Sequence, residues 1–509
     1  MSVPRPAFLG VVVLTLAGQA VAVGYEVVLA ARFGTGIEAD ALALTLMIVV
    51  AAANELGTWI STLFVPQYVD ARARDGEAAA AGFLGAGLTA VAAGSLALAA
   101  LVALAAPGIV ALLAPDLAAR GAAVGLLRLF APLVVLAPVS VLLAAALQAN
   151  DRFVLAGARQ LCWYGATVVA LVALAPRLGA AAVPVGMVAG YALFCLLLAA
   201  DLRARVPAAR VPPGGAGRRE GVARLRGLAG LLLPLALASA LNYVNVTFER
   251  AIAARLPEGS LAALTYAFRL LNFPVNLLVL NATAMLLPAL ARHASRDEPA
   301  EVAALVLRAL RLTLVFTVGL AALAVALAGP LVAVLLERGA FTAASTALTA
   351  TAVVWYAPGL IGIACAQVLA RAYQAVHEVR RLIATGVVAI VLSIALMPAL
   401  TAAIGFRGLP IATSIVAVLL SAVMLLGIRG RLPGLALGAL LSSAWRVGLA
   451  GAAAAAVAWA ARGVAGDGLA ALATGVVAGA GSYAALLGLV ARGDARLAVA
   501  AVLPALARR

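Results

Sequence analysis

The sequence is poor in charge, in histidine and in cysteine, and it contains no lysine. Charged residues make up only 11% of the 509 residues, whereas hydrophobic residues make up 65%. A water-soluble globular protein is about half apolar and about a quarter charged, so this composition excludes a soluble enzyme. All 36 basic residues are arginine, which, together with the heavy use of alanine, we attribute to genomic composition bias.

The few cysteines and histidines do not form a reactive or metal-binding pattern. Cys162, Cys195 and Cys365 lie inside apolar runs with no partner at metal or redox spacing, so we interpret them as packing residues. His293 and His377 fall at loop edges beside arginines, where a solvated position is expected. The sequence also has no phosphate-binding Walker loop and no nucleophile elbow. We therefore expect neither catalysis nor a bound cofactor or metal.

Long apolar runs recur from one end of the chain to the other, and they predict an all-α polytopic membrane protein. The first run, 7–31, is too long for a signal-peptide core, so we expect it to remain as a transmembrane helix. Charged residues and Pro/Gly breaks divide the chain into about fourteen spans. The predicted spans are 8–31, 40–67, 80–105, 121–149, 153–175, 179–201, 227–254, 260–290, 300–328, 342–374, 381–403, 407–428, 441–462 and 467–491.

The arginines lie in short patches between the apolar runs, and this pattern orients the chain. The formal net charge of +16 therefore indicates loops that face anionic lipid rather than a nucleic-acid partner. With the N-terminus inside, roughly twenty arginines fall in inside loops and about eight in outside loops, so both termini are expected to be cytoplasmic. The longest polar stretch, 203–226, contains seven arginines and a Pro-Pro-Gly-Gly run, and we interpret it as a linker.

The two halves of the chain resemble each other. Tyr25-Glu26 and the residues that follow align with Phe248-Glu249, 223 positions later, and the same offset carries Pro107 onto Pro330. An even number of spans separates the matches, so the repeats are predicted to be parallel. The expected organisation is a six-helix bundle at 1–202, a basic cytoplasmic linker at 203–226, a second six-helix bundle at 227–430, and two extra transmembrane helices with a short tail at 431–509.

Polar side chains inside the apolar spans are the candidate functional residues, because each is costly there without a partner or a cavity. Gln19 and Glu26 lie on one face of the first span, and the offset carries them onto Asn242 and Glu249 in the seventh. Such residues either line a transport cavity or simply join helices. Span two adds Asn54, Glu55 and Thr58, and span eight adds Thr265, Arg269, Asn272 and Asn276.

Two further features concern backbone and packing. In span eight, Pro274 cannot donate to the carbonyl of Leu270, which frees a backbone acceptor next to Arg269. Because Arg269 has no acid three or four residues away, we favour a cavity-facing role for it. The glycine pairs Gly186–Gly190 and Gly475–Gly479 have the spacing of close helix packing, and we interpret both as packing sites.

Four segments, distributed over both halves of the chain, carry a recognisable pattern. The segments are 31–40 with Phe64-Val65-Pro66, 256–270 with Leu287-Pro288, 336–342 with 368–373, and 408–414. In their order and spacing they resemble the MurJ/MviN family of lipid II flippases in the multidrug/oligosaccharidyl-lipid/polysaccharide exporter superfamily.

The resemblance implies fourteen helices around a cationic central cavity, and export of undecaprenyl-pyrophosphate-linked peptidoglycan precursor by alternating access. It also implies that Arg269 is the family's cavity arginine of helix eight and that Asp40 is the acid that opens helix two. Other family positions have lost their charge. The helix-one arginines fall on Gln19 and Tyr25, the helix-two basic pair on 51–53, the helix-eight acid on Asn272, the helix-ten lysine on Gln367, and the sodium ligands of helix eleven on Ser393 and Met397.

From these residues we expect a flippase for lipid II in the bacterial inner membrane, with no chemical step. The alternatives are a polysaccharide-unit or drug exporter of the same superfamily, and a degenerate scaffold for envelope synthesis. The expected partners are a lipid-linked oligosaccharide, membrane lipids and cell-wall synthesis enzymes, with no nucleic acid and a monomeric state. The candidate substrate-binding residues are Arg269, Asn272, Asn276, Gln19, Asn242, Asp40, Glu26, Glu249 and Glu55.

Overall fold

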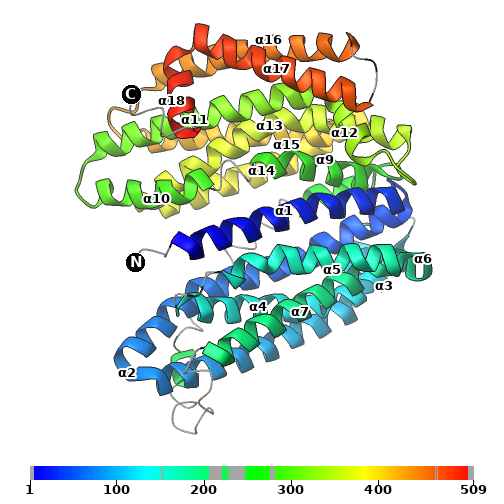
Figure 1. The fold of residues 1–509 in the computed structure, drawn as a ribbon, viewed down its shortest axis with the longest axis vertical. Helices are drawn as coiled ribbons and strands as arrows, with labels where there is room; N and C mark the ends of the chain where they lie inside the picture. The colour runs from blue at the N-terminus through cyan, green and yellow to red at the C-terminus, as the bar shows by residue number, and fades with distance from the viewer. Residues whose placement is uncertain are drawn as a thin grey trace. The chain divides into compact units, whose positions relative to one another are not determined.

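The structure is a computed structural model that describes residues 5–205 without 118, 151 and 153, then 221–225, 227, 247–275, and 281–502 without 465 and 467. These residues form α-helices and short 3-10 turns and contain no strand, which confirms the predicted all-α class. The chain divides into two compact units (Figure 1). The N-terminal unit comprises Met1–Tyr243, Pro257–Gly259 and Arg338–Ala340, and the C-terminal unit comprises the remainder. Most of the predicted linker lies outside the described residues, so the domain boundaries stay a prediction.

Ten helical segments among the described residues are long and apolar enough to cross a membrane. Some of these segments each contain more than one predicted span. Spans two and three both fall within α2 (Ile37–Leu113), where Gly76 breaks the helix with φ 84° and ψ −176°. The chain turns back at this point (Figure 1), so one glycine replaces the loop expected between the two spans.

The N-terminal unit is built from α1 (Arg5–Phe33), α2 and the helices that follow it. α2 packs against α3 (Arg120–Phe130) and α4 (Leu133–Gln148), while α5 (Arg159–Ala173) packs against α1 and α7 (Ala182–Arg205). The connections are η1 (Leu155–Ala158), α6 (Ala175–Leu178) and η2 (Gly179–Ala181). Stacked rings of Phe64 and Phe83, with centroids 4.9 Å apart, lie in the core together with Leu142 and Phe194.

Two glycines bring α5 and α7 together, as their spacing predicts. A Cβ added at Gly186 would lie 2.7 Å from Thr167 Cα, and one at Gly190 would lie 2.6 Å from the carbonyl oxygen of Cys162. Neither position has room for a side chain. In a lipid environment the hydrophobic effect does not press helices together, so such close backbone packing holds the pair.

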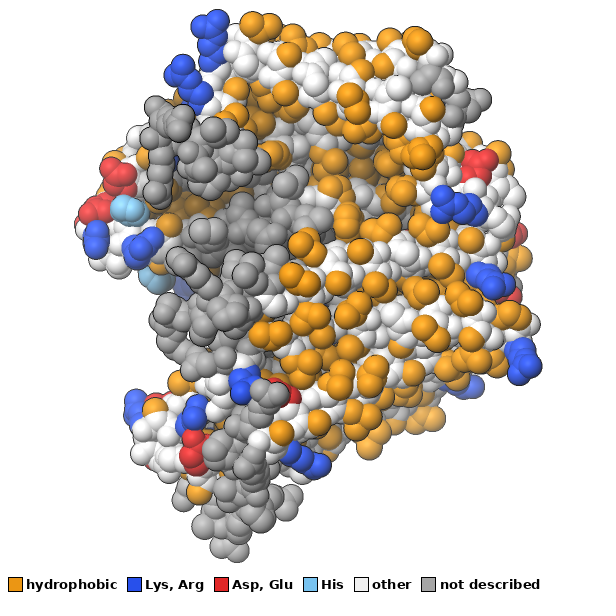
Figure 2. All heavy atoms as spheres, in the orientation of Figure 1, with side chains coloured by type: hydrophobic (Ala, Val, Ile, Leu, Met, Phe, Trp, Pro, Cys, Tyr) orange, Lys and Arg blue, Asp and Glu red, His pale blue; other side chains and the backbone are white. Residues whose placement is uncertain are grey.

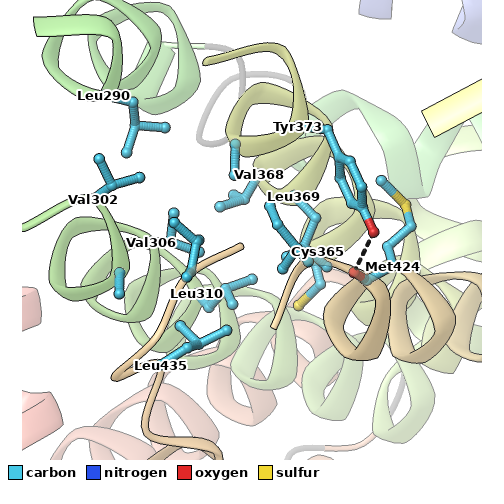
Figure 3. Packing of buried hydrophobic residues seen from close by; sticks show 14 of the residues in the cluster. Leu290, Val302, Val306, Leu310, Cys365, Val368, Leu369, Tyr373, Met424 and Leu435 are labelled. Carbon is cyan, nitrogen blue, oxygen red and sulfur yellow. Dashed lines mark hydrogen bonds between the residues drawn. The ribbon is translucent and has the colours of Figure 1, made fainter. Parts of the chain in front are cut away.

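The C-terminal unit is organised around α13 (Ala343–Ala375). This helix packs against α9 (Ser260–Val275), α10 (Asn281–Ala294), α11 (Pro299–Ala326) and α15 (Gly408–Ile428). Its buried cluster includes Val306, Leu310, Val368 and Leu369, and the Tyr373 hydroxyl donates to the Met424 carbonyl at 2.9 Å (Figure 3). α14 (Val379–Ile404) and η5 (Gly405–Arg407) lead into α15.

The last two predicted spans form the pair α16 (Leu437–Val464) and α17 (Gly468–Val490), which packs against α11. Gly475 and Gly479 lie at this contact, because a Cβ on either would be 2.5 Å from Leu327 or Leu323 respectively. The Tyr483 hydroxyl donates to the Val315 carbonyl at 2.6 Å. Among the described residues, two of the longer helices lie outside the predicted spans: α12 (Ala328–Leu336) after span nine, and α18 (Arg492–Val502) where only a short tail was expected.

Exposed side chains are largely apolar along the helices. Figure 2 shows hydrophobic side chains over the helix lengths, while charged side chains gather near helix ends on the visible face. Leu104 is 80% exposed and Trp445 is 68% exposed. A soluble domain would bury many such side chains, whereas lipid tails solvate them. The surface therefore agrees with a protein that spans a membrane.

Candidate functional site

The predicted anion contact lies on α9. Thr265, Arg269 and Asn272 follow at intervals of four and three residues and share one face of this helix, and all three are half-buried. The side-chain amide of Asn272 donates to the Phe268 carbonyl at 2.9 Å, so one of its donors serves its own helix. The helix continues through Pro274 and ends at Val275. This face carries a guanidinium and an amide within one helical turn.

A second polar group lies beside α9 in the same unit and contains Glu249. This residue belongs to the helical stretch 247–253, is 9% exposed, and accepts a hydrogen bond of 2.6 Å from the Tyr356 hydroxyl of α13. The neighbouring Arg250 is equally buried and donates to Thr265 Oγ1 at 3.0 Å. Adjacent residues of opposite charge therefore reach two different helices, α13 and α9.

Arg250 and Tyr356 were not among the predicted site residues. The repeat offset places Arg250 on Val27, an apolar residue, so the comparison of the two halves gave no signal for it. Tyrosines are common in apolar spans, and no pattern distinguished Tyr356 from the other eight. A search for adjacent acid and base inside a single apolar run would have found the pair Glu249–Arg250.

Asp40 lies at the start of α2 and is buried, at 5% exposure. Its Oδ2 accepts the backbone N–H of Gly259 at 2.8 Å, although the two residues are 219 positions apart. The predicted role was substrate binding, but this oxygen already holds a backbone donor. The role of Asp40 in substrate binding stays a prediction.

Two short turns from the later chain complete this contact. Gly259 has φ 84° and Gly339 has φ 58°, values that glycine adopts without a steric penalty. A Cβ on Gly259 would lie 2.2 Å from the Thr35 carbonyl oxygen, and one on Gly339 would lie 2.3 Å from that of Ala31. The Ala340 N–H also donates to the Ala31 carbonyl at 2.8 Å. We call the residues 31–40, 257–259 and 338–340 the turn contact.

Only some of the remaining candidate residues lie in the described part of the structure. Gln19 and Glu26 are half-buried on α1, seven residues and therefore about two turns apart. Glu55 lies within α2, but its side chain is outside the description, and Asn242 and Asn276 lie outside the described residues. Within the described part of the chain, no three His, Cys, Asp or Glu side chains gather as they would for a metal ion.

The fold is similar to the folds of solved membrane transporters. A solved lipid II flippase MurJ in an inward closed conformation matches with a TM-score of 0.79 and 18% identity, over 95% of this chain and 99% of that one. An inward-facing multidrug resistance transporter of the MATE family matches with a TM-score of 0.63 and 16% identity, over 82% and 94%. At these identities the likeness establishes the fold alone.

Comparison of the sequence with family models identifies the family. The family model described as lipid II flippase MurJ matches residues 29–473, and the chain belongs to this family, as its motifs predicted. A probable lipid II flippase MurJ of Bdellovibrio bacteriovorus is 32% identical over 274 residues, 52% of this chain and 50% of that protein. The lipid II flippase MurJ of Burkholderia cenocepacia is 28% identical over 226 residues, 44% and 43% respectively.

These matches span about half the length of the curated relatives. The relatives are named as flippases, so the family is one of transporters rather than catalysts. Together with the ten apolar helical segments, family membership makes the chain a multi-pass protein of the bacterial inner membrane.

Proposed function

We propose that this protein moves lipid II, a polar head group on a lipid anchor, across the bacterial inner membrane by alternating access. The observation that carries the proposal is the match of the MurJ family model to residues 29–473. Such a transporter must stabilise anionic phosphate away from bulk water, which is costly without a cation. Arg269 is the residue we assign to this task, because its planar guanidinium suits two phosphate oxygens at once.

Neutral groups on the same helix are suited to bind the sugars of the head group. Asn272 lies one turn from Arg269 on the same face, and its side-chain carbonyl oxygen is an acceptor suited to sugar hydroxyls. Gln19, Glu26, Asn242, Asn276 and Glu55 remain proposed contacts to the head group. For Asp40 and Glu249 we propose a different task, since both already hold donors in the structure.

Alternating access requires a contact that closes one side and can open. The turn contact has the properties of such a closure: it consists of two backbone turns held by the Asp40–Gly259 and Ala340–Ala31 hydrogen bonds. A few hydrogen bonds of about 0.5–1.5 kcal/mol each hold a state without locking it. We assign these residues to the closure and expect their hydrogen bonds to break once per cycle. With both termini cytoplasmic, as proposed from the arginines, the closure lies on the outer side.

The proposal is tested by flipping of labelled lipid II in liposomes that contain the purified protein. Arg269→Ala should lower affinity for lipid II about ten- to a hundredfold, because a charge-assisted hydrogen bond contributes roughly 1.5–3 kcal/mol. Arg269→Lys should retain part of the activity, since the charge remains while the bidentate fork is lost. Arg308→Ala, at an exposed arginine of α11, is the matched control and should behave as wild type.

If Arg269→Ala also flips lipid II as wild type does, Arg269 does not bind the pyrophosphate. If the wild-type protein does not flip lipid II at all, the substrate differs. The absence of charge at Gln367, Ser393 and Met397, where the resemblance implies a lysine and sodium ligands, favours an exporter of another substrate as the second candidate. Complementation of a bacterial strain depleted of its own lipid II flippase separates these two functions from each other and from a scaffold.

A further inference from the structure

The unexpected helix α18 begins at the end of a membrane span. α17 ends at Val490 and α18 starts at Arg492, so a single residue, Ala491, separates them. A helix that follows a span so closely lies at the boundary between hydrocarbon and water. α18 has two different faces, and each is defined by contacts or exposure in the structure.

The inner face of α18 is fixed by a buried ion pair and by small apolar residues. Asp494 is 3% exposed at its side chain, and its Oδ1 lies 2.6 Å from Nε of Arg311 on α11. Ala495 and Ala498 pack against the cluster that contains Leu487 of α17 and Val447 of α16. A Cβ on Gly493 would lie 3.3 Å from a terminal nitrogen of Arg311, so the helix fits closely over this pair.

The outer face carries only positive charge among the described residues of α18. Arg492, Arg496 and Val499 are exposed and lie at intervals of four and three residues, on one side of the helix. Asp494 is the only acid between Arg492 and Arg509, and its burial against Arg311 keeps it away from this face. The ion pair therefore sets the rotation of α18 so that two arginines point outward without a neighbouring acid on the same helix.

We propose that this outer face is a binding surface for anionic phospholipid, with Arg492 and Arg496 on the phosphodiester head groups and Val499 toward the acyl boundary. The position at the end of a span brings the helix to the head groups, and the charge selects those that are anionic. Each arginine near such a surface contributes a favourable free energy, and the two contributions combine. This surface is separate from α9 and does not depend on the proposed function.

The test is native mass spectrometry of the purified full-length protein titrated with phosphatidylglycerol or with phosphatidylcholine. Wild type should bind phosphatidylglycerol in preference to phosphatidylcholine. The double variant R492Q/R496Q should bind phosphatidylglycerol about ten- to thirtyfold more weakly, the loss expected for two surface arginines. R492K/R496K, which keeps both charges, should bind as wild type does. Both substituted side chains are exposed, so folding is not at stake.

The matched control is R120Q/R177Q, which removes two exposed arginines from α3 and α6 and so gives the same change in net charge. It should retain the preference for phosphatidylglycerol. Equal binding of the two lipids by wild type, or unchanged binding by R492Q/R496Q, would overturn the proposal. So would a dimer in wild type that R492Q/R496Q abolishes, because the face would then belong to a second copy of the chain.

Discussion

Glu249 is a carboxylate in an apolar part of the chain, and individual hydrogen-bond partners stabilise it there. Its Oε1 accepts the Tyr356 hydroxyl, and its neighbour Arg250 is held by Thr265. A buried charge without partners would cost several kcal/mol, so these two hydrogen bonds are what make the pair tolerable at this depth. Each also connects the helical stretch 247–253 to a different helix of the C-terminal unit.

The strength of the hydrogen bond from Tyr356 to Glu249 can be compared with that of a tyrosine hydrogen bond to a neutral backbone carbonyl. Tyr356→Phe removes a hydrogen bond to a carboxylate and should lower the free energy of unfolding by about 1.5–3 kcal/mol. Tyr373→Phe removes an equally buried hydroxyl that donates to the Met424 carbonyl, and it should cost only about 0.5–1.5 kcal/mol. Thermal unfolding of both variants in detergent provides the comparison, and equal losses would mean that the Glu249 acceptor contributes no more than a backbone carbonyl does.

At the scale of the helices, the sequence located most spans but not their junctions. Apolar length predicted α1, α11, α13, α16 and α17, because a span needs about twenty apolar residues and little else produces such a run. It did not predict that α2 would contain two spans, since a reversal at Gly76 depends on one backbone conformation. Nor did it predict α18, a short helix that packs against α11 and α17 and has no long apolar run of its own.

Close helix packing at glycine predicts that an added methyl group at Gly190 destabilises the protein. Gly190→Ala places a methyl group 2.6 Å from the Cys162 carbonyl oxygen and 2.7 Å from Trp163 Cα, so α5 and α7 must separate. Gly165→Ala is the matched control on α5, since nothing lies within 4 Å of the added carbon. Overpacking typically costs about 1–3 kcal/mol. We expect a lower unfolding temperature for Gly190→Ala and an unchanged or slightly higher one for Gly165→Ala, where alanine favours the helix.

At the scale of the whole molecule, the candidate site was predictable only in part. Arg269 stood out because a charge in a span is rare, and it lies in the part of the chain that the family model matches. The turn contact could not be found in the same way. Asp40 and Gly259 are 219 residues apart, and their contact depends on a backbone N–H that any residue except proline could offer. Long-range contacts of this kind leave no local pattern in a sequence.

If the turn contact opens in every transport cycle, locking it closed should stop transport. A Cβ on Gly36 would lie 4.0 Å from a Glu258 carboxylate oxygen, so cysteines at 36 and 258 can be joined by a short reducible cross-linker. In a background with Cys162, Cys195 and Cys365 replaced by alanine, cross-linking should reduce lipid II flipping to the level of protein-free liposomes. Reduction should restore it. Full activity of the cross-linked protein would show that this contact stays closed during transport.

The Arg311–Asp494 pair has a consequence for biosynthesis. The two residues are 183 positions apart, so the ribosome delivers the arginine to the membrane long before its carboxylate partner exists. During that interval Arg311 lacks the carboxylate that pairs with it in the folded protein. Completion of the protein is thereby coupled to its assembly, because a product that stops before Asp494 leaves Arg311 without this partner. Membrane quality-control proteases are expected to remove such products selectively.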